Sequence, residues 1–214
     1  MKIMKTAYLV RHGESRGNAS PIFLSEGTGL TEKGRAEAAA AAVRCAKLGA
    51  GALISSTMER ARETAKIIGA GIGMRPEFSD LFVERKFPSD FLGKRRDDPE
   101  VLDIVRRMHD GRGAPGFRFS DEDNFEDLNA RASKALAHLA ELPAEKIVLI
   151  THGFFMRVMA ARVFFGDALT AAEYARVANG LMTDNAGISA FRYDSENAAA
   201  PWSVLAWNDS AHLS

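Results

Sequence analysis

The sequence predicts an α/β fold: a three-layer sandwich with a mainly parallel sheet, helices on both of its faces and an antiparallel edge. Three observations carry this prediction. Short, continuously apolar runs are typical of buried parallel strands. Segments with helical character alternate with these runs along the chain. Two β-type segments near the C-terminus are separated by a turn, which is the pattern of an antiparallel pair.

The apolar runs that predict the strands are short and end abruptly at polar corners. The first run ends at Arg11-His12-Gly13 and a later one ends at Thr151-His152-Gly153. Each therefore reads as a buried strand that leads into a loop. We expect strands at residues 7–10, 52–55 and 147–150, a weaker strand at 78–83, and a closing pair at 188–193 and 203–207.

The helices are predicted from composition and from residues that mark helix ends. The alanine-rich segment 35–48 follows a potential cap at Thr31 and precedes Gly49. Ser56-Thr57-Met58-Glu59 has the capping-box pattern, which predicts a helix from there to about residue 68. Further helices are expected from Pro99 (after an Asp97 or Asp98 cap) to about residue 108, and at 123–142, 154–165 and 170–179.

Length, charge and cysteine content limit the classes of protein to consider. The 214 residues suggest one domain, with an inserted cap-like region at about 85–120 over the active-site end. Lys and Arg number 28, as do Asp and Glu, and zero net charge argues against a dedicated nucleic-acid or anionic-membrane binder. Cys45 is the single cysteine, so an intramolecular disulfide is excluded and a cytoplasmic setting is expected. We find no membrane or targeting segment.

Two histidine-glycine corners are the first sign of function. His12 and His152 each stand just past a predicted strand and before a glycine. Ligands of open α/β sheets bind outside the carboxyl ends of the strands, so both corners can face one pocket. A metal site is disfavoured, because the sequence has no clustered ligand motif and Arg11 repels a cation.

Two arginines give the expected pocket an affinity for anions. Arg11 adjoins His12, and Arg60 lies in the first turn of a predicted helix, close to unpaired amide groups. Arginine forks match phosphate oxygens in bidentate geometry. A phosphoryl group is therefore the expected occupant, whereas Arg62 is better explained as a solvated surface residue.

These motifs together resemble the histidine phosphatase superfamily, also called phosphoglycerate mutase-like. The resemblance runs from about residue 6 to 190 and rests on several blocks in the family's order. These are Arg11-His12-Gly13-Glu14-Ser15 with Asn18, Arg60-Ala61 with Thr64-Ala65, Glu84, and Thr151-His152-Gly153, with weaker matches at 124–128, Arg131 and 185–189.

The resemblance implies a phosphomonoesterase that acts on a small phosphorylated substrate. It implies that His12 is the nucleophile and forms a phosphohistidine. Arg11, Arg60 and His152 would hold the non-bridging oxygens, and Asn18 would add a neutral hydrogen bond. Glu84 would protonate the leaving group and then activate water. No metal or organic cofactor is implied.

The assignment of the acid has rivals. Many relatives have an aromatic-glycine pair after the acid, whereas Arg85-Lys86-Phe87-Pro88 follows Glu84 here. Asp80 and Asp90 are therefore alternatives, and Glu84 can also be read as a surface carboxylate. We expect most basic residues of the inserted region to be solvated charges, because acidic residues interleave with them, although some of these basic residues could recognise the non-reacting part of an anionic substrate. They are Arg85, Lys86, Lys94, Arg95, Arg96, Arg106, Arg107, Arg112 and Arg118.

Two other functions compete with hydrolysis. A phosphoglycerate mutase-type isomerase would return the phosphoryl group to a reoriented product, and a non-catalytic member would only bind phosphorylated ligands. The missing aromatic-glycine continuation ranks the mutase second, and the filled catalytic positions rank the binder third. The sequence leaves the substrate and the oligomeric state open.

Overall fold

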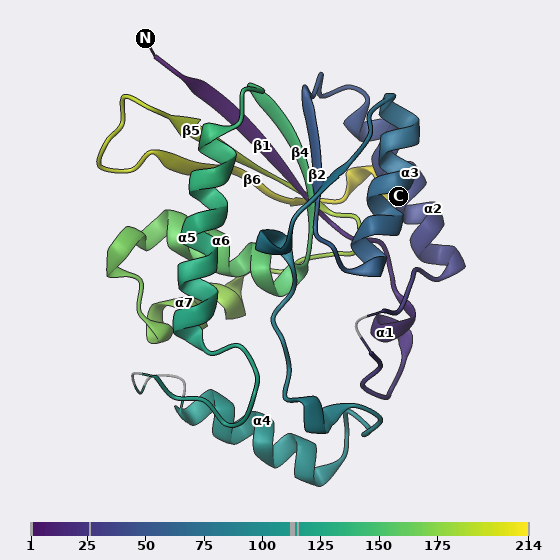
Figure 1. Ribbon diagram of the computed structural model, residues 1–214, viewed down its shortest axis with the longest axis vertical. Helices are drawn as coiled ribbons and strands as arrows, with labels where there is room; N and C mark the ends of the chain where they lie inside the picture. Colours follow the sequence, from purple (N-terminus) through teal and green to yellow (C-terminus); the bar gives the residue numbers. More distant parts are fainter. Residues whose placement is uncertain (1, 26, 112–113, 115, 214) are drawn as a thin grey trace.

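The computed structural model describes residues 2–25, 27–111, 114 and 116–213. Its centre is one six-stranded sheet, flanked by helices on both faces (Figure 1). The predicted α/β sandwich is therefore confirmed. The order of the strands across the sheet is β3 (Glu77–Phe78), β2 (Ala52–Ser55), β4 (Lys146–Thr151), β1 (Met4–Arg11), β5 (Ile188–Asp194) and β6 (Trp202–Asp209).

The pairing of the strands brings the two histidine corners together. Strands β3, β2, β4 and β1 are parallel, whereas β5 and β6 form the predicted antiparallel edge. Arg11 is paired with Thr151 in the register of β1 and β4. The residues that follow, His12 and His152, therefore leave adjacent strands at the same end of the sheet.

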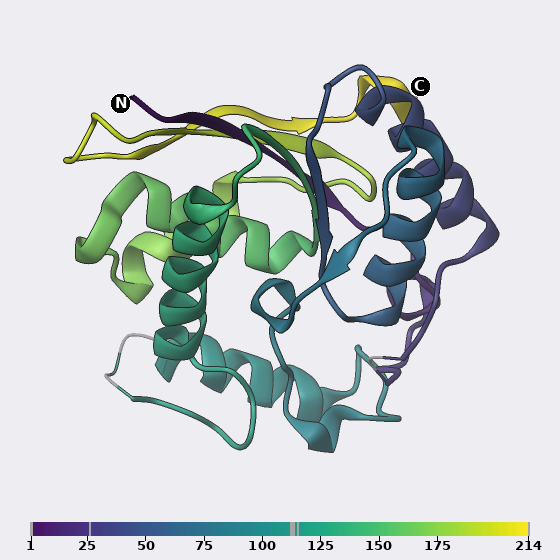
Figure 2. The ribbon, with the colours of Figure 1, turned by 45° about the horizontal axis from the view of Figure 1, so that its top comes forward.

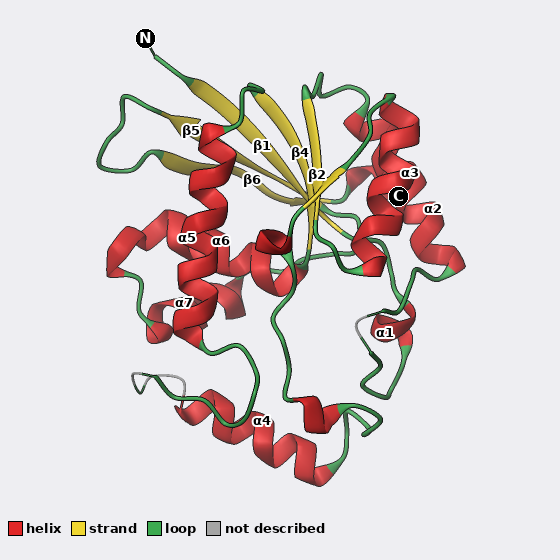
Figure 3. Cartoon of the chain, viewed as in Figure 1, coloured by secondary structure: helices red, strands yellow, loops and turns green. Residues whose placement is uncertain are grey.

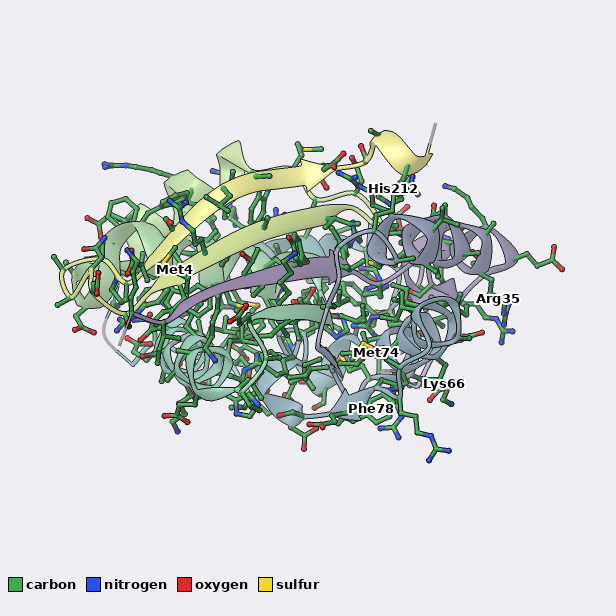
Figure 4. The ribbon with its side chains drawn as sticks, turned by 90° about the horizontal axis from the view of Figure 1, so that it is seen from above. Met4, Arg35, Lys66, Met74, Phe78 and His212 are labelled. Carbon is green, nitrogen blue, oxygen red and sulfur yellow. The ribbon has the colours of Figure 1, made fainter. Side chains whose placement is uncertain are left out.

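The alternating side chains of the strands build two cores. Leu9 and Leu149 pack on the face covered by α5, α6 and α7, whereas Val10 and Ile150 pack against α2 and α3. Figure 2 shows these two groups of helices on opposite sides of the sheet. Figure 4 views the layers from above, with Arg35 on α2 and Lys66 on α3 at the same side.

The helices are α1 (Arg16–Ala19), α2 (Glu32–Cys45), α3 (Glu59–Ile72), α4 (Pro99–Gly111), α5 (Phe125–Glu141), α6 (Gly153–Phe165) and α7 (Ala171–Gly180), with short 3-10 turns at Asp80–Phe82, Ser89–Phe91, Gly166–Ala168 and Ala211–Leu213.

The segment expected to be an insertion has a small core of its own. Phe91, Val101 and Ile104 are buried together, with Phe23 and three other partly buried apolar residues around them. Helix α4 lies away from the sheet, and long loops connect it to the rest of the chain (Figure 3). Arg112, Gly113 and Pro115 lie outside the described residues. The division into a single domain with an insertion at about 85–120 stays a prediction.

A second chain segment is joined to this insertion by backbone hydrogen bonds. Phe23 N–H donates to the carbonyl of Lys94, and Gly93 N–H donates to the carbonyl of Phe23, both at 2.9 Å. Ile22 also forms an isolated antiparallel bridge with Arg95. The loop after β1 and the insertion therefore form one continuous rim.

Two sequence predictions are wrong in detail. No capping box precedes α3: its N-cap is Met58, and the Ser56 hydroxyl instead accepts from Met58 N–H and contacts His152. The expected strand at 78–83 ends at Phe78, because the Ser79 hydroxyl accepts from Leu81 N–H and turns the chain into a 3-10 helix.

The other helix boundaries agree with the predictions to within a few residues. The Thr31 hydroxyl accepts from Gly34 N–H and caps α2, so this helix begins at Glu32, before the predicted residue 35. The helix ends at Cys45, before the predicted residue 48. Of the two predicted caps for α4, Asp98 accepts from Glu100 N–H, and Pro99 is the first helical residue. None of the helices in the described part of the chain is long and apolar enough to cross a bilayer.

Candidate active site

A cavity of about 690 Å³ lies where β1 and β4 end. Its walls come from the loop after β1, the start of α3, the inserted segment and the first turns of α6. Parallel strands place such openings at their carboxyl ends, where loops supply the functional groups. Five of the six predicted site residues line it, namely Arg11, His12, Asn18, Arg60 and Glu84.

His12 and His152 are buried and adjacent. Their ring centroids are 5.0 Å apart and their planes meet at 60°. His12 lines the cavity, whereas His152 stands beside it and is not among the described residues of the cavity wall. The two corners that the sequence singled out therefore belong to one site.

The hydrogen bonds of His12 determine its tautomer. Nδ1 lies 2.7 Å from the carbonyl oxygen of Gly13, which can only accept, so Nδ1 carries the proton. Nε2 lies 3.1 Å from Nε of Arg60, which can only donate, so Nε2 accepts. The ring is thus neutral, with the lone pair of Nε2 on the side of Arg60.

Burial and nearby cations keep this ring neutral. Burial lowers the pKa of His12 well below its ordinary value, and the positive charges of Arg60 and Arg11 lower it further, against the effect of the Gly13 carbonyl. A neutral imidazole retains the lone pair that a nucleophile requires.

His152 is neutral for similar reasons. Burial lowers the pKa of His152 well below its usual value, and His12, Arg60 and Arg11 add to the effect. Its Nε2 lies 2.8 Å from the Ser56 hydroxyl oxygen. Its Nδ1 is buried and has no hydrogen-bond partner among the described residues. A buried polar atom of this kind is stabilised when a ligand pairs with it.

Arg11 is held against the first residue of α6. Its Nη1 donates to the carbonyl of Thr183 at 2.5 Å, while its buried Nε has no partner within the described part of the chain. A Cβ atom on Gly153 would lie 2.6 Å from Thr183 Oγ1 and 3.2 Å from Arg11 Nε. Gly153 is therefore required for the close approach of Arg11 to α6.

Glu84 is fixed by backbone amides at the N-terminus of α6. Its carboxylate accepts hydrogen bonds from Phe154 N–H at 3.1 Å and from Phe155 N–H and Arg85 N–H at 3.0 Å. The carboxylate is thereby placed at the positive end of the helix dipole and on the cavity wall. Neither alternative acid, Asp80 nor Asp90, lines the cavity, and Asp80 accepts from the Thr57 hydroxyl instead.

Asn18 is an exposed residue at the rim of the cavity. Its Oδ1 accepts from the amide and the hydroxyl of Ser15, at 3.2 and 2.9 Å, in a capping box of α1. Its Nδ2 has no hydrogen-bond partner in the part of the chain that the structure describes, so this amide group can donate to a ligand.

The basic residues of the insertion divide into two groups. Lys94, Arg95 and Arg106 form exposed ion pairs with nearby carboxylates, as expected for solvated charges. Arg85, Lys86 and Arg96 instead line the cavity. Sequence reasoning could not separate these groups, since the segment has no regular period that would reveal which residues share a face.

Several residues of the site were not predicted. Four phenylalanines form an apolar wall, Ser56 contacts His152, Thr183 contacts Arg11, and Arg157 lines the cavity. Arg157 had a detectable signal, because it is a charge within the strongly apolar segment 154–165. The aromatic wall consists of Phe23, Phe87, Phe91 and Phe154. Among the described residues, no group of three or more His, Cys, Asp or Glu side chains is placed to hold a metal ion.

Comparison with known proteins agrees with the motifs. The sequence profile of the histidine phosphatase superfamily (branch 1) matches residues 7–210. A probable phosphoglycerate mutase GpmB from Citrobacter koseri is 30% identical, over 98% of this chain and 95% of that protein. A homologue with the same name from Salmonella arizonae is 29% identical, with the same coverage.

Solved structures share the fold at low sequence identity. Bacillus stearothermophilus YhfR superposes with a TM-score of 0.80 at 23% identity, covering 98% of this chain and all (100%) of that one. A mycobacterial glucosyl-3-phosphoglycerate phosphatase, solved with VO3, gives 0.76 at 22% identity, covering 95% and 98%. A mutant phosphoserine phosphatase from Entamoeba histolytica, in complex with phosphoserine, gives 0.76 at 18% identity, covering 98% and 100%. Because the profile spans nearly the whole chain and the motifs meet at one cavity, this protein belongs to the histidine phosphatase superfamily, branch 1.

Proposed function

We propose that the protein hydrolyses phosphomonoesters of small molecules through a phosphohistidine on His12. The observation that carries the proposal is the state of His12. Its Nδ1 proton is held by Gly13, and its Nε2 lone pair faces a cationic cavity next to Arg60. This arrangement suits attack on an electrophile that carries negative charge.

In the first step, Nε2 of His12 attacks the phosphorus atom, and the bond from phosphorus to the ester oxygen breaks. Protonated Glu84 gives its proton to the departing oxygen, so the alcohol leaves in neutral form. Arg60 must release Nε2 when substrate enters, and its guanidinium then binds a phosphoryl oxygen. Arg11 and His152 bind the other charged oxygens, through Nε and Nδ1, which have no partner among the described residues.

In the second step, water attacks the phosphorus atom and the bond from phosphorus to Nε2 breaks. Glu84 takes the proton from this water, inorganic phosphate leaves and His12 returns to its starting state. Asn18 supports binding by donating from its side-chain amide. The position of Glu84 on the cavity wall supports both of its roles.

The experiment is a rapid quench with ³²P-labelled substrate, followed by peptide mapping. We expect acid-labile, base-stable label on His12 that disappears as phosphate is released. His12→Asn should abolish the label, and His138→Asn on α5 is the matched control. Label on His152, or turnover without label, would contradict the proposal.

The homologues named phosphoglycerate mutase favour a second candidate function. A mutase would transfer the phosphoryl group from His12 back to a product hydroxyl before water reacts. Incubation with 3-phosphoglycerate separates the two functions, because a hydrolase yields inorganic phosphate and a mutase yields 2-phosphoglycerate. Binding with neither product would indicate a non-catalytic member.

A further inference from the structure

The cavity carries more positive charge than one phosphoryl group needs. Its wall holds one carboxylate, Glu84, among the described residues, against six cationic side chains. Those six are Arg11, Arg60, Arg85, Lys86, Arg96 and Arg157. A phosphomonoester dianion is matched by Arg11 and Arg60 beside the nucleophile, so the other four cations require an explanation.

Three of those four have structural contacts that explain them. Lys86 pairs with Asp121 at 2.7 Å. Arg96 donates to the carbonyls of Gly17 and Ser20 and lies over the ring of Phe23 at the rim. Arg85 lies between two rings, 4.2 Å from the centroid of Phe87 and 4.0 Å from that of Phe154. Each of these contacts ties one cavity segment to another.

Arg157 differs because its contacts orient it without neutralising it. Its Nε donates to the carbonyl of Gly153 at 3.2 Å, and its Nη1 donates to the carbonyl of Ala178 at 3.3 Å. Its guanidinium carbon also lies 5.7 Å from the centroid of the Phe154 ring, farther than that of Arg85. Neither bond uses Nη2, and no carboxylate lies within ion-pair distance of this guanidinium in the described part of the chain. The side chain is therefore held rigidly on the cavity wall with its charge uncompensated.

The position of Arg157 is next to the phosphate-binding end of the cavity. Gly153 accepts its Nε bond and also adjoins Arg11, whose Nε would be 3.2 Å from a Cβ atom on Gly153. Burial is the main cause that lowers the pKa of Arg11, and the charge of Arg157 lowers it further against the opposing effect of Glu84. Arg157 is thus close enough to Arg11 for their charges to interact.

We infer that Arg157 binds a second anionic group of the substrate, so the preferred substrates are phosphomonoesters with a carboxylate or another phosphate near the ester. This inference rests on the proposed function of the same cavity. A guanidinium fixed before binding loses little entropy when it pairs with an anion, and it matches either group in geometry. The apolar wall beside it lowers the local polarity and strengthens the interaction.

The test compares ligands that differ only in the second anion. Glycerol 1-phosphate has a hydroxymethyl group where 3-phosphoglycerate has a carboxylate, and glycerol 1,3-bisphosphate carries a second phosphate at the same carbon. Affinities are measured as Ki against p-nitrophenyl phosphate, or by calorimetry for a protein that does not turn it over. The proteins are wild type, Arg157→Met, Arg157→Lys and the control Arg162→Met, which changes the net charge equally on α6 but lies outside the described cavity wall.

We expect wild type to bind at least one of the two ligands with a second anionic group about 10- to 100-fold more tightly than glycerol 1-phosphate. This is the effect of a hydrogen bond to a charged group. Arg157→Met should remove this preference while it changes the affinity for glycerol 1-phosphate less than about threefold. Arg157→Lys should keep part of the preference, and Arg162→Met all of it. The ligand that wild type prefers identifies the second anion as carboxylate or phosphate.

Two results would overturn the inference. Parallel losses for all three ligands in Arg157→Met would mean that Arg157 holds the ester phosphate or only joins α6 to α7. No preference in wild type would mean that no second anion is recognised. The proposed function fails separately, if wild type neither releases phosphate from p-nitrophenyl phosphate nor becomes labelled on His12.

Discussion

Arg131 of α5 donates a hydrogen bond from Nη2 to the backbone carbonyl of Glu84 at 3.3 Å, so α5 helps to fix the position of Glu84. The same guanidinium donates to the carbonyl of Val83 and to Asp123 at 3.0 Å, and Asp123 also accepts from Lys86 N–H. The backbone on both sides of Glu84 is thus attached to one ion pair. Arg131 is a positioning residue in this arrangement, since it acts through Glu84.

Arg131→Met should therefore reduce activity where the acid matters most. We expect single-turnover transfer from alkyl phosphates to fall about 10-fold or more, with a much smaller loss for p-nitrophenyl phosphate, because a phenolate needs less protonation. Adding Arg131→Met to Glu84→Gln should produce little further loss, because Arg131 acts through Glu84. A merely structural role would lower the rates for both substrates alike.

Glu84→Gln tests the acid itself. The substitution keeps the size of the side chain and its acceptor for Phe155 N–H and Arg85 N–H, loses the second acceptor that Phe154 N–H uses, and removes the transferable proton. Transfer from alkyl phosphates should fall about 10²–10⁴-fold, and transfer from p-nitrophenyl phosphate much less. Quenched-flow measurement must separate this step from dephosphorylation, which the same carboxylate serves. Equal losses would indicate that Glu84 is structural and would direct the same substitution to Asp80 and Asp90.

The two buried histidines should make stability depend on pH. Burial lowers the pKa of both below the value of 6.5 that they have in the unfolded chain. The unfolded state therefore binds more protons as the pH falls below 6.5, and the stabilisation present above that pH is lost. The expected slope is about 1.4 kcal/mol per pH unit for each histidine until the folded protein is protonated.

Urea unfolding at pH 7.5 and 5.5 measures this loss. His152→Gln should reduce the difference in unfolding free energy between the two pH values, whatever it does to the stability at either one. His109→Gln, at an exposed position of α4, should leave the difference as in wild type. An unchanged difference in His152→Gln would show that His152 does not contribute to it.

Gly13 should tolerate no side chain. A Cβ atom there would lie 2.2 Å from the carbonyl oxygen of Gly34, a backbone atom that cannot rotate away. Gly13→Ala should therefore destabilise the protein by about 1–3 kcal/mol or more, as overpacking does. Gly180→Ala, where a Cβ atom has open space in α7, should be neutral or stabilising. Thermal unfolding of the two variants distinguishes a steric effect from a general intolerance of glycine replacement.

Chelation should leave the activity intact. The proposed mechanism uses arginines and histidines where other phosphatases use a metal ion, and phosphate release should persist after exhaustive dialysis against EDTA. Loss of turnover that zinc or magnesium restores would require a different mechanism.

The sequence predicted the sheet and the meeting of Arg11, His12 and His152 at one end of it, because both depend on local patterns. A continuous apolar run such as residues 147–150 has few alternatives to a buried strand, and two strand ends in one sheet bring His12 and His152 together. The tautomer of His12 could not be predicted, since it depends on the distances to Gly13 and Arg60. Ser56 was misassigned as a helix cap because its hydroxyl instead contacts His152 and the amide two residues later. The aromatic wall could not be predicted, because Phe23, Phe87 and Phe154 come from three separate segments that share no repeating pattern in the sequence.

The separate small core around Phe91, Val101 and Ile104 has a consequence for how the cavity of this protein can change. Side chains of the inserted segment line part of the cavity wall. The core of Phe91, Val101 and Ile104 that supports them is separate from the two cores on the faces of the sheet. We therefore expect replacement of residues 87–96 to alter which alcohols fit, while Arg85 and Lys86 stay in place and keep the position of Glu84. Phe23 is joined to residues 93–94 by backbone hydrogen bonds, so the loop after β1 and the inserted segment must be exchanged together. On the proposed function, the part of substrate choice that this rim determines is transplantable, whereas recognition through Arg157 stays with α6.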